Sequence, residues 1–415
     1  MDSTQSTGVP SGEEILKAAF AIEPDVRAAQ DEIERERRLP AHLVEKMKRA
    51  GFFAMPMPKT WGGPETDPLT QLRIVEQLSY ADGSVGWCTM IGCDSGFFTA
   101  FLDQDVARAM YPDIRVSTAS ALTLTGRAVK TNGGYRVSGR WPFSSGCLHA
   151  AWIVGGCVVY EGDREIRDSE GAPVSVQCFF RPEEIEILDT WHTIGLRGSG
   201  SNDFAAQDVF VPEERTFSLQ KPAIRRPEPL YALPMAILLK FATVPIGIAR
   251  AAIDELIDAA GRRPTRLTVI GGKPAPAKLL RDEPFVQDAV ARAEAMVGSA
   301  RSYLYDITAE LWATLLKGDN PDRKLGARWS LVAGDGERIP RLGRSGRVDL
   351  QGARRIGGLC RRTARSMPAR RAHDQPARRG FAEGLRDGRP QPARIGADEL
   401  GFLSRGRIAA ARPSC

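Results

Sequence analysis

A change in hydrophobic period is the feature that most constrains what this chain can fold into. Up to about residue 110 apolar side chains recur at helical spacing, and helical spacing returns at about residue 229. The chain between them breaks into short, turn-bounded segments, expected as strands at 115–120, 126–131, 135–140, 151–160, 174–181, 184–189 and 203–211. Helices, then strands, then helices predict an α+β protein of three domains, the middle one a small barrel or sandwich.

The expected domain boundaries follow this change of period. Residues 1–112 are predicted to form an N-terminal helical domain, residues 113–215 a β-barrel domain, and residues 228–325 a partial C-terminal helical bundle. Residues 326–415 form an Arg-, Gly- and Pro-rich tail that disrupts the bundle. A chain of 415 residues is long enough for several domains, each with its own core.

Composition excludes several classes of protein. Met1 to Val26 lacks the apolar core of a signal peptide, and no run approaches the roughly 18 apolar residues of a membrane span, so we expect a cytoplasmic protein without membrane association. The seven cysteines form no CxxC pair, and the four histidines are not spaced as metal ligands. We therefore expect no metal, and we expect His149 and His192 to make structural hydrogen bonds.

The tail differs from the rest of the chain in composition. Residues 341–415 contain 18 Arg, no Lys and six acidic residues, whereas residues 1–340 contain 39 basic and 45 acidic residues. Interleaved aromatic residues are absent there, so we do not expect nucleic-acid binding. Arg, Ala, Gly and Pro have GC-rich codons, and we therefore favour a shifted reading frame near residues 320–330. Translating the other two frames would test this, because one of them should then encode amphipathic helices.

The segment from Val137 to Val154 is the most informative for function. Two strands meet there at Ser144, Ser145 and a glycine, flanked by Trp141 and Phe143. A planar conjugated cofactor needs such a site, with an aromatic wall, small residues and hydroxyls for its ring heteroatoms. An ordinary strand–turn–strand with buried aromatic residues is the alternative.

Three groups of residues, in this order and spacing, resemble the acyl-CoA dehydrogenase superfamily over roughly residues 15–325. They are Leu39-Pro40 with Gly51-Phe52-Phe53 and Trp61-Gly62-Gly63, then Gly139 to Gly146, then Gly195 to Asn202 followed by Asp208 to Pro212. The resemblance implies the superfamily's fold: an N-terminal helical domain, a middle β-barrel and a C-terminal helical bundle. It also implies a homotetramer and a noncovalent flavin, FAD or FMN, between the barrel and the bundle.

The resemblance also assigns residues to the flavin. Ser144 falls on a family Thr whose hydroxyl and amide lie near flavin N5 and O4. Ser117 and Thr118 are expected to contact the pyrimidine side of the flavin, and plain strand packing is the alternative for them. A surface salt bridge is the alternative for Arg197. The expected cofactor-binding residues are Ser117, Thr118, Trp141, Phe143, Ser144, Ser145 and Arg197, and the expected catalytic residues are Ser144 and Trp87.

Two branches of the superfamily differ in chemistry. Acyl-CoA dehydrogenases use a carboxylate base and an acidic Gly-rich loop. The run from Ser117 to Gly126, where that loop would lie, contains no acidic residue. The oxygenase components of two-component flavin monooxygenases, such as those resembling p-hydroxyphenylacetate hydroxylase, take reduced flavin from a reductase and form a flavin C4a-hydroperoxide. Asp82 to Trp87, Trp141 to Trp152 and Trp191 to Ser201 resemble this second branch. A hydroperoxide needs a dry pocket with few donors, which Trp, Phe and Ser side chains provide.

The sequence therefore predicts a flavin-dependent oxidoreductase. A reduced-flavin monooxygenase that hydroxylates an aromatic or polycyclic small molecule, with a flavin reductase as partner, is favoured. The first alternative is an acyl-CoA dehydrogenase that oxidises an acyl thioester with FAD. The second is an inactive or flavin-free product of a frame-shifted gene.

Overall fold

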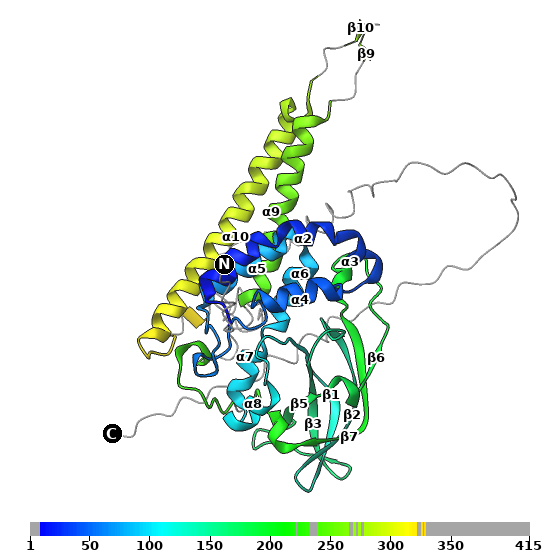
Figure 1. Ribbon diagram of the computed structural model, residues 1–415, viewed down its shortest axis with the longest axis vertical. Helices are drawn as coiled ribbons and strands as arrows, with labels where there is room; N and C mark the ends of the chain where they lie inside the picture. Colours follow the sequence, from blue (N-terminus) through cyan, green and yellow to red (C-terminus); the bar gives the residue numbers. More distant parts are fainter. Residues whose placement is uncertain are drawn as a thin grey trace, which may run out of the picture.

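The computed structural model describes residues 9–220, 222–232, 239–264 and 278–321, with the short pieces 269–270, 273–274, 325–326 and 328. N-terminal helices pack against a β-sheet domain, and two long C-terminal helices lie side by side and extend beyond both (Figure 1). The expected order of helices, strands and helices is confirmed. No helix in the described ranges is long and apolar enough to cross a membrane. The predicted tail lies almost entirely outside the described residues.

Helices α1 to α8 form the N-terminal domain, and side-chain caps explain where some of them begin. Ser11 starts α1 with a capping box, Asp67 caps α5, and the Asp82 carboxylate accepts from two amides at the start of α6. The helices are α1 (Gly12–Ala21), α2 (Glu23–Ala28), α3 (Gln30–Glu36), α4 (Ala41–Arg49), α5 (Pro68–Ala81), α6 (Gly83–Gly92), α7 (Ser95–Phe98) and α8 (Gln104–Met110), with 3-10 turns η1 (Lys59–Trp61) and η2 (Thr99–Phe101).

The middle domain is a largely antiparallel sheet in which β1 and β3 pair in parallel. The strands pair in the order β6-β7-β2-β1-β3-β5-β8, with β4 beside β3. From Thr118 on, the segments expected at 115–120 and 126–131 belong to a single strand, β1, which is interrupted by bulges near Leu124. The strands are β1 (Thr118–Thr131), β2 (Gly134–Ser144), β3 (Trp152–Glu161), β4 (Arg164–Glu165), β5 (Ser175–Phe180), β6 (Glu186–Leu188), β7 (Asn202–Pro212) and β8 (Thr216–Phe217), with 3-10 turns η3 (Pro182–Glu184), η4 (Arg197–Ser199) and η5 (Glu213–Arg215).

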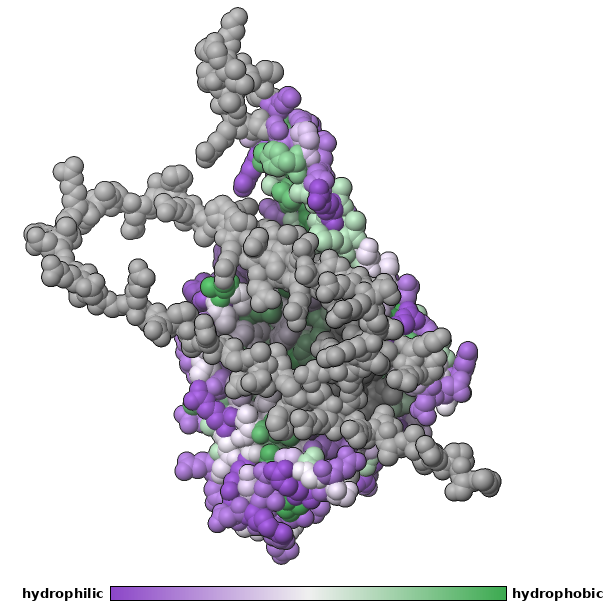
Figure 2. Space-filling model, turned by 180° about the vertical axis from the view of Figure 1, so that it is seen from behind, coloured by the Kyte–Doolittle hydropathy of each residue, from purple (hydrophilic) through white to green (hydrophobic). Residues whose placement is uncertain are grey.

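Two long helices form the described part of the C-terminal bundle. After the 3-10 turn η6 (Pro229–Tyr231), α9 (Leu239–Arg262) and α10 (Pro284–Leu316) pack antiparallel, joined through the short strands β9 (Val269–Ile270) and β10 (Lys273–Pro274) and the turn η8 (Leu280–Asp282). Figure 2 shows apolar surface along this arm. Leu256 and Ile257 of α9 are exposed apolar residues. A helix pair with apolar residues on its outer face is consistent with an incomplete bundle.

Helix α6 joins the three parts of the molecule. It packs against α5 in its own domain, against α9 of the C-terminal helices, and against β1 and η4 of the sheet domain. Almost all of its side chains are buried, with Val85 and Met90 fully covered in the core of the helical domain. The contacts of α6 with the sheet and with α9 place the candidate site.

Candidate functional site

The end of β2 departs from regular strand geometry beside the predicted serines. Its pairing with β7 slips between Trp141 and Ser144, which is a bulge, and Phe143 within the bulge has φ +64°. An aromatic residue rarely adopts this left-handed conformation, which costs about 1–3 kcal/mol. Bulges and strained residues are frequent next to active sites, where they turn a side chain out of the sheet.

Ser144, the last residue of β2, is fully buried, and its Oγ has no hydrogen-bond partner within the described residues. A buried hydroxyl without a partner costs about 1–3 kcal/mol, so it needs an explanation. A hydrogen-bonding ligand is one such explanation. Among the residues expected to bind the cofactor, Ser144 therefore has a hydroxyl that is free to form a hydrogen bond with a ligand.

Ser145 is placed differently, because its hydroxyl already has protein partners. It accepts from Trp87 Nε1 at 2.8 Å and lies 2.7 Å from Ser201 Oγ, which lies 2.7 Å from Ser199 Oγ. Three hydroxyls carry three hydrogens, and the two links between them use two. One hydrogen therefore remains that can be donated to a group outside these three residues. If Ser199 donates to Ser201 and Ser201 donates to Ser145, this hydrogen belongs to Ser145.

Trp87, predicted to be catalytic, lies on α6 and connects the sheet to α9. Its indole donates to Ser145 and meets the Phe241 ring edge-on, with ring centroids 5.5 Å apart. Phe241 belongs to α9, so one side chain contacts a strand end and a C-terminal helix. Phe241 carried no recognisable signal in the sequence, whereas Ser199 and Ser201 lie in the Gly195 to Asn202 run.

Ser117 and Thr118 lie near the start of β1, and their hydroxyls are bound to protein. Ser117 Oγ donates to the backbone oxygen of His149 at 3.2 Å, and Thr118 Oγ1 is 2.7 Å from the Tyr111 hydroxyl. Both residues are buried. These contacts fit strand packing, the alternative that the sequence left open for them.

His149 follows the Ser144 turn and is half-buried, with its Nε2 atom enclosed. Burial, with a smaller contribution from the positive charge of Lys48, lowers its pKa to about 4, so the imidazole is neutral at pH 7. Its Nε2 has no hydrogen-bond partner in the part of the chain that the structure describes. A Cβ on Gly146 would come within 3.1 Å of that nitrogen, and Gly146 has φ +74°, so glycine suits this turn on both counts.

Trp141, predicted to wall the cofactor, lies inside the sheet domain. It is fully buried in the core of the sheet domain, stacks on Phe204 with centroids 4.7 Å apart, and donates from Nε1 to Gly156 O at 2.7 Å. A Cβ at Gly126 or Gly155 would collide with the indole, so these glycines make room for it. Trp141 therefore fills the core.

Phe143 and Arg197 are the remaining predicted cofactor residues. Phe143 is 67% exposed and meets Trp191 edge-on at 6.2 Å, so its ring is free to contact a ligand. Arg197 instead ties η4 to α3: its Nε donates to Glu34 O at 3.0 Å and pairs with the Glu34 carboxylate at 3.3 Å, while Nη1 donates to Thr193 O. The salt bridge that the sequence left open as its alternative is what the structure shows.

An open groove adjoins the same strand ends. Its volume is about 530 Å³, and Leu148 and Asn202 border it together with Arg35 and Arg38. Asn202 is the β7 partner of Ser144. In the described residues, no group of three or more His, Cys, Asp or Glu side chains could hold a metal ion.

These residues fit a flavin in two respects. The unpartnered Ser144 hydroxyl could bind a ring heteroatom, and Phe143 offers an exposed aromatic face. Trp87, Ser145, Ser199 and Ser201 form the connected polar support behind them. The indole of that support comes from the helical domain and the serines from the sheet domain, so the arrangement exists only in the folded molecule.

Comparison with known proteins gives consistent matches. The family models described as acyl-CoA dehydrogenase, N-terminal domain, and acyl-CoA dehydrogenase, C-terminal domain, match residues 17–104 and 239–335. The chain is 31% identical to the flavin-dependent monooxygenase oxygenase subunit HsaA of Rhodococcus jostii over 335 residues, which are 77% of this chain and 83% of that protein. It is 32% identical to indole-3-acetate monooxygenase of Pseudomonas putida, covering 71% and 72% of the two chains.

A solved structure agrees with these relatives. The crystal structure of 3-HSA hydroxylase from Rhodococcus sp. RHA1 superposes with a TM-score of 0.71 at 26% identity, covering 85% of this chain and 87% of that one. The similarity thus extends over the helical domain, the sheet and the C-terminal helices together.

Proposed function

The chain belongs to the flavin-dependent monooxygenases of the acyl-CoA dehydrogenase superfamily, and from this premise we propose that it is an oxygenase component that hydroxylates an aromatic small molecule. Flavin is its cofactor, used in the reduced form. The observation that carries the proposed site is the buried, unpartnered hydroxyl of Ser144 beside the Trp87–Ser145 hydrogen bond.

The side chains around this hydroxyl favour oxygenation over acyl-thioester oxidation. A dehydrogenase needs a carboxylate base at the reacting carbon. The two acidic residues that flank α6 are both engaged: Asp82 caps the start of the helix, and Asp94, just after its end, is bound to Lys240. The groups in contact with Trp87 and Ser145 are hydroxyls and an aromatic ring.

Each residue has a role that follows from its contacts. A bound reduced flavin supplies the electrons that activate molecular oxygen. Ser144 would hydrogen-bond the cofactor's polar edge, and Phe143 would cover part of its ring. Trp87 donates to Ser145 and so holds the hydroxyl of that serine beside Ser144. The buried surroundings of both serines exclude water, which strengthens hydrogen bonds there and limits side reactions.

The use of reduced flavin calls for a second protein. We propose a flavin reductase as the partner and an aromatic small molecule as substrate, as the names of the HsaA and indole-3-acetate relatives support. A homotetramer and a cytoplasmic location remain part of the proposal, as do FMN or FAD as the form of flavin.

Turnover by the purified chain tests the proposal. The protein is mixed with FMN or FAD, NADH, a flavin reductase and oxygen, and phenols are assayed for hydroxylated product. Product that requires all components supports a monooxygenase. Bleaching of oxidised FAD by an acyl-CoA, without hydroxylation, would instead identify a dehydrogenase.

A frame-shifted, flavin-free product is the remaining candidate. The C-terminal family match ends at residue 335, close to where the tail was predicted to begin, and this supports the candidate. An absorbance titration with FMN and FAD separates it from the other two, since a chain without a flavin site leaves the spectrum of free flavin unchanged.

A further inference from the structure

Three reactive side chains meet between the end of α6 and the start of α9. They are Cys93, Asp94 and Lys240, and these residues are only 0%, 2% and 3% exposed. The Lys240 ammonium donates to Asp94 Oδ1 at 2.7 Å and to Cys93 Sγ at 3.1 Å. The Cys93 thiol in turn donates to the backbone oxygen of Met90 at 3.3 Å. A sulfur atom and an amine nitrogen are therefore held in direct contact, away from bulk water.

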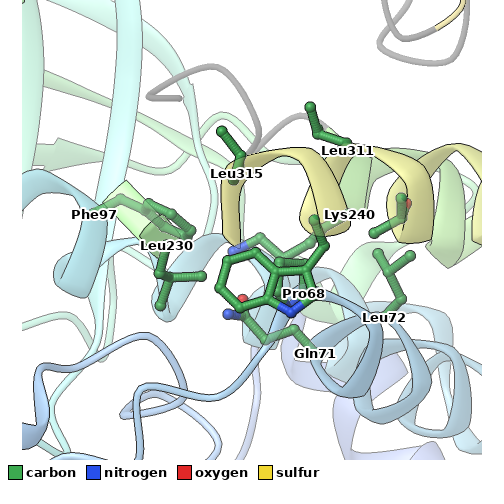
Figure 3. A pocket seen from close by; sticks show the side chains of 10 residues that line it. Pro68, Gln71, Leu72, Phe97, Leu230, Lys240, Leu311 and Leu315 are labelled. Atoms are coloured by element: carbon green, nitrogen blue, oxygen red, sulfur yellow. The ribbon is translucent and has the colours of Figure 1, made fainter. Parts of the chain in front are cut away.

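A small cavity adjoins this cluster, because Lys240 also lines it. Its volume is about 20 Å³, which is room for roughly one water molecule. Figure 3 shows Lys240 among side chains from other elements that border this space, such as Gln71 of α5 and Leu311 of α10. Of the residues that line the cavity, Lys240 alone carries a charge. Only a molecule close to water in size can enter, and hydrogen peroxide is an oxidant of that kind.

Stability does not explain why these charges are buried. Replacing a buried ion pair by apolar side chains of similar volume is often neutral or stabilising. Burial raises the pKa of the Asp94 carboxyl to about 6, although the Lys240 ammonium beside it opposes this rise. Burial also raises the pKa of the Cys93 thiol to about 11, again against the effect of Lys240. The sulfur therefore keeps its proton at neutral pH, so it reacts slowly with an oxidant.

We propose that Cys93 and Lys240 form a covalent sulfur–nitrogen link when hydrogen peroxide reaches them, which makes this pair an oxidative modification site. Peroxide first oxidises the Cys93 thiol to a sulfenic acid, and one water molecule forms. The Lys240 ammonium passes one proton to the Asp94 carboxylate, and the resulting amine attacks the sulfur. The sulfur–oxygen bond breaks, and the hydroxide leaves as water with a second proton from the nitrogen. In total one peroxide is reduced, the sulfur loses two electrons, and two water molecules form.

The contacts of Cys93 favour this link over other products of oxidation. Its Sγ lies 3.1 Å from Lys240 Nζ, and reacting atoms are about 3–3.5 Å apart in a productive arrangement. A sulfenic acid condenses with a neighbouring thiol or nitrogen. The side chain that hydrogen-bonds Cys93 is an amine, and the five described cysteines are free thiols. After the link forms, the nitrogen is uncharged and Asp94 holds a proton, so the cost of burying two charges disappears.

The link would join two helices beside the candidate flavin site. Phe241, the residue after Lys240, meets the Trp87 ring edge-on, and Trp87 donates to Ser145. Cys93 and Lys240 are 147 positions apart, and the sheet domain lies between them in the sequence. A covalent link would therefore hold α9 against the end of α6. Reduced flavin and oxygen yield peroxide when no substrate is hydroxylated, so the proposed oxygenase is itself a source of the oxidant.

Peptide mass spectrometry of the purified full chain tests the proposal. The protein, without flavin, is incubated with hydrogen peroxide, its remaining thiols are alkylated, and it is digested without reductant. We expect two peptides joined at Cys93 and Lys240, lighter by two hydrogens than the sum of the separate peptides. Dithiothreitol should separate them, because it restores the thiol and the amine. Before reduction, the thermal melting midpoint should be higher by about 5 °C, since the link closes a long loop.

Variants show whether both side chains are needed. Cys93→Ser and Lys240→Met should give no linked peptides. Cys88→Ser, which removes another buried thiol of α6, is the matched control and should keep the link. If Lys240→Met does not fold by thermal melting, the double variant Lys240→Met with Asp94→Leu removes both charges together and should also give no link.

The masses of the products decide the outcome. A linked pair that contains one further oxygen atom supports the same site, because it requires only a second peroxide. Absence of linked peptides in the wild-type chain would overturn the inference, as would Cys93 oxidised to a sulfinic acid with Lys240 unmodified. No flavin is present in this experiment, so its result does not depend on whether the chain hydroxylates a substrate.

Discussion

The indole nitrogen of Trp87 donates to the hydroxyl of Ser145 at 2.8 Å and so connects a helix of the N-terminal domain to the end of strand β2. The two residues are 58 positions apart, and the bond leaves Ser145 engaged and its neighbour Ser144 free. These two consecutive hydroxyls are therefore expected to respond differently to substitution.

Replacing Ser144 by Ala should separate stability from flavin binding. The substitution removes a buried hydroxyl that has no partner, so the flavin-free protein should keep its stability or gain about 1 kcal/mol. Flavin affinity should fall roughly tenfold, corresponding to about 1.4 kcal/mol. Thermal melting and a flavin titration measure the two effects. Unchanged flavin affinity would show that Ser144 does not contact the cofactor.

Replacing Ser145 by Ala should have the opposite effect on stability. It leaves the Trp87 N–H and one side of Ser201 without partners, which should lower the free energy of unfolding by about 1–3 kcal/mol. Urea denaturation measures the change, with Ser144→Ala as the matched control at the next position. Equal stability of the two variants would contradict the engaged role of Ser145.

Replacing Trp141 by Phe should test its assignment to the core. The change opens a void beside Phe204 and leaves the Gly156 carbonyl without its donor, so we expect a loss of about 2–4 kcal/mol in unfolding free energy. The folded fraction should bind flavin as the wild type does. A selective loss of flavin affinity at unchanged stability would restore the cofactor role first predicted for this residue.

Protonation of His149 should make the fold sensitive to mild acid. Its pKa is lowered to about 4 in the folded state, whereas the unfolded chain binds the proton near its ordinary value of about 6.5. The stabilisation is therefore complete above pH 6.5 and is lost as the pH falls toward 4, by roughly 2 kcal/mol between pH 7 and 5. Urea denaturation of wild type and His149→Gln at several pH values measures this. Parallel pH curves for the two proteins would rule the mechanism out.

Sequence periodicity was enough to predict the order of the fold. The capping residues Ser11, Asp67 and Asp82 mark helix starts that the structure contains, and the turn-bounded segments after residue 115 became the sheet. Motif resemblance also pointed to the serine pair and Trp87 as site residues, and this stays a prediction. These signals are local, because a cap, a turn or a helical spacing depends on residues close together in the chain.

Local patterns did not predict the different burial of Trp141 and Phe143. Both residues flank the serine pair in the sequence and were expected to wall one cofactor, and in a regular strand residues two apart point to the same face. The bulge and the left-handed φ of Phe143 break that alternation, and the result is one buried ring and one that is 67% exposed. Thr118 and Arg197 follow the alternatives that the sequence left open, since Tyr111 and Glu34 occupy their polar groups.

What the sequence alone determined is the succession of helical and β segments, the family, and the presence of hydroxyls and indoles at the right places along the chain. Tertiary structure decided which of those groups is free: Ser144 rather than Ser145, and Lys240 as a buried donor beside a cavity. The reason is that a polar group's availability depends on the partners that packing brings to it. Those partners come from positions more than 50 residues away, which local patterns do not specify.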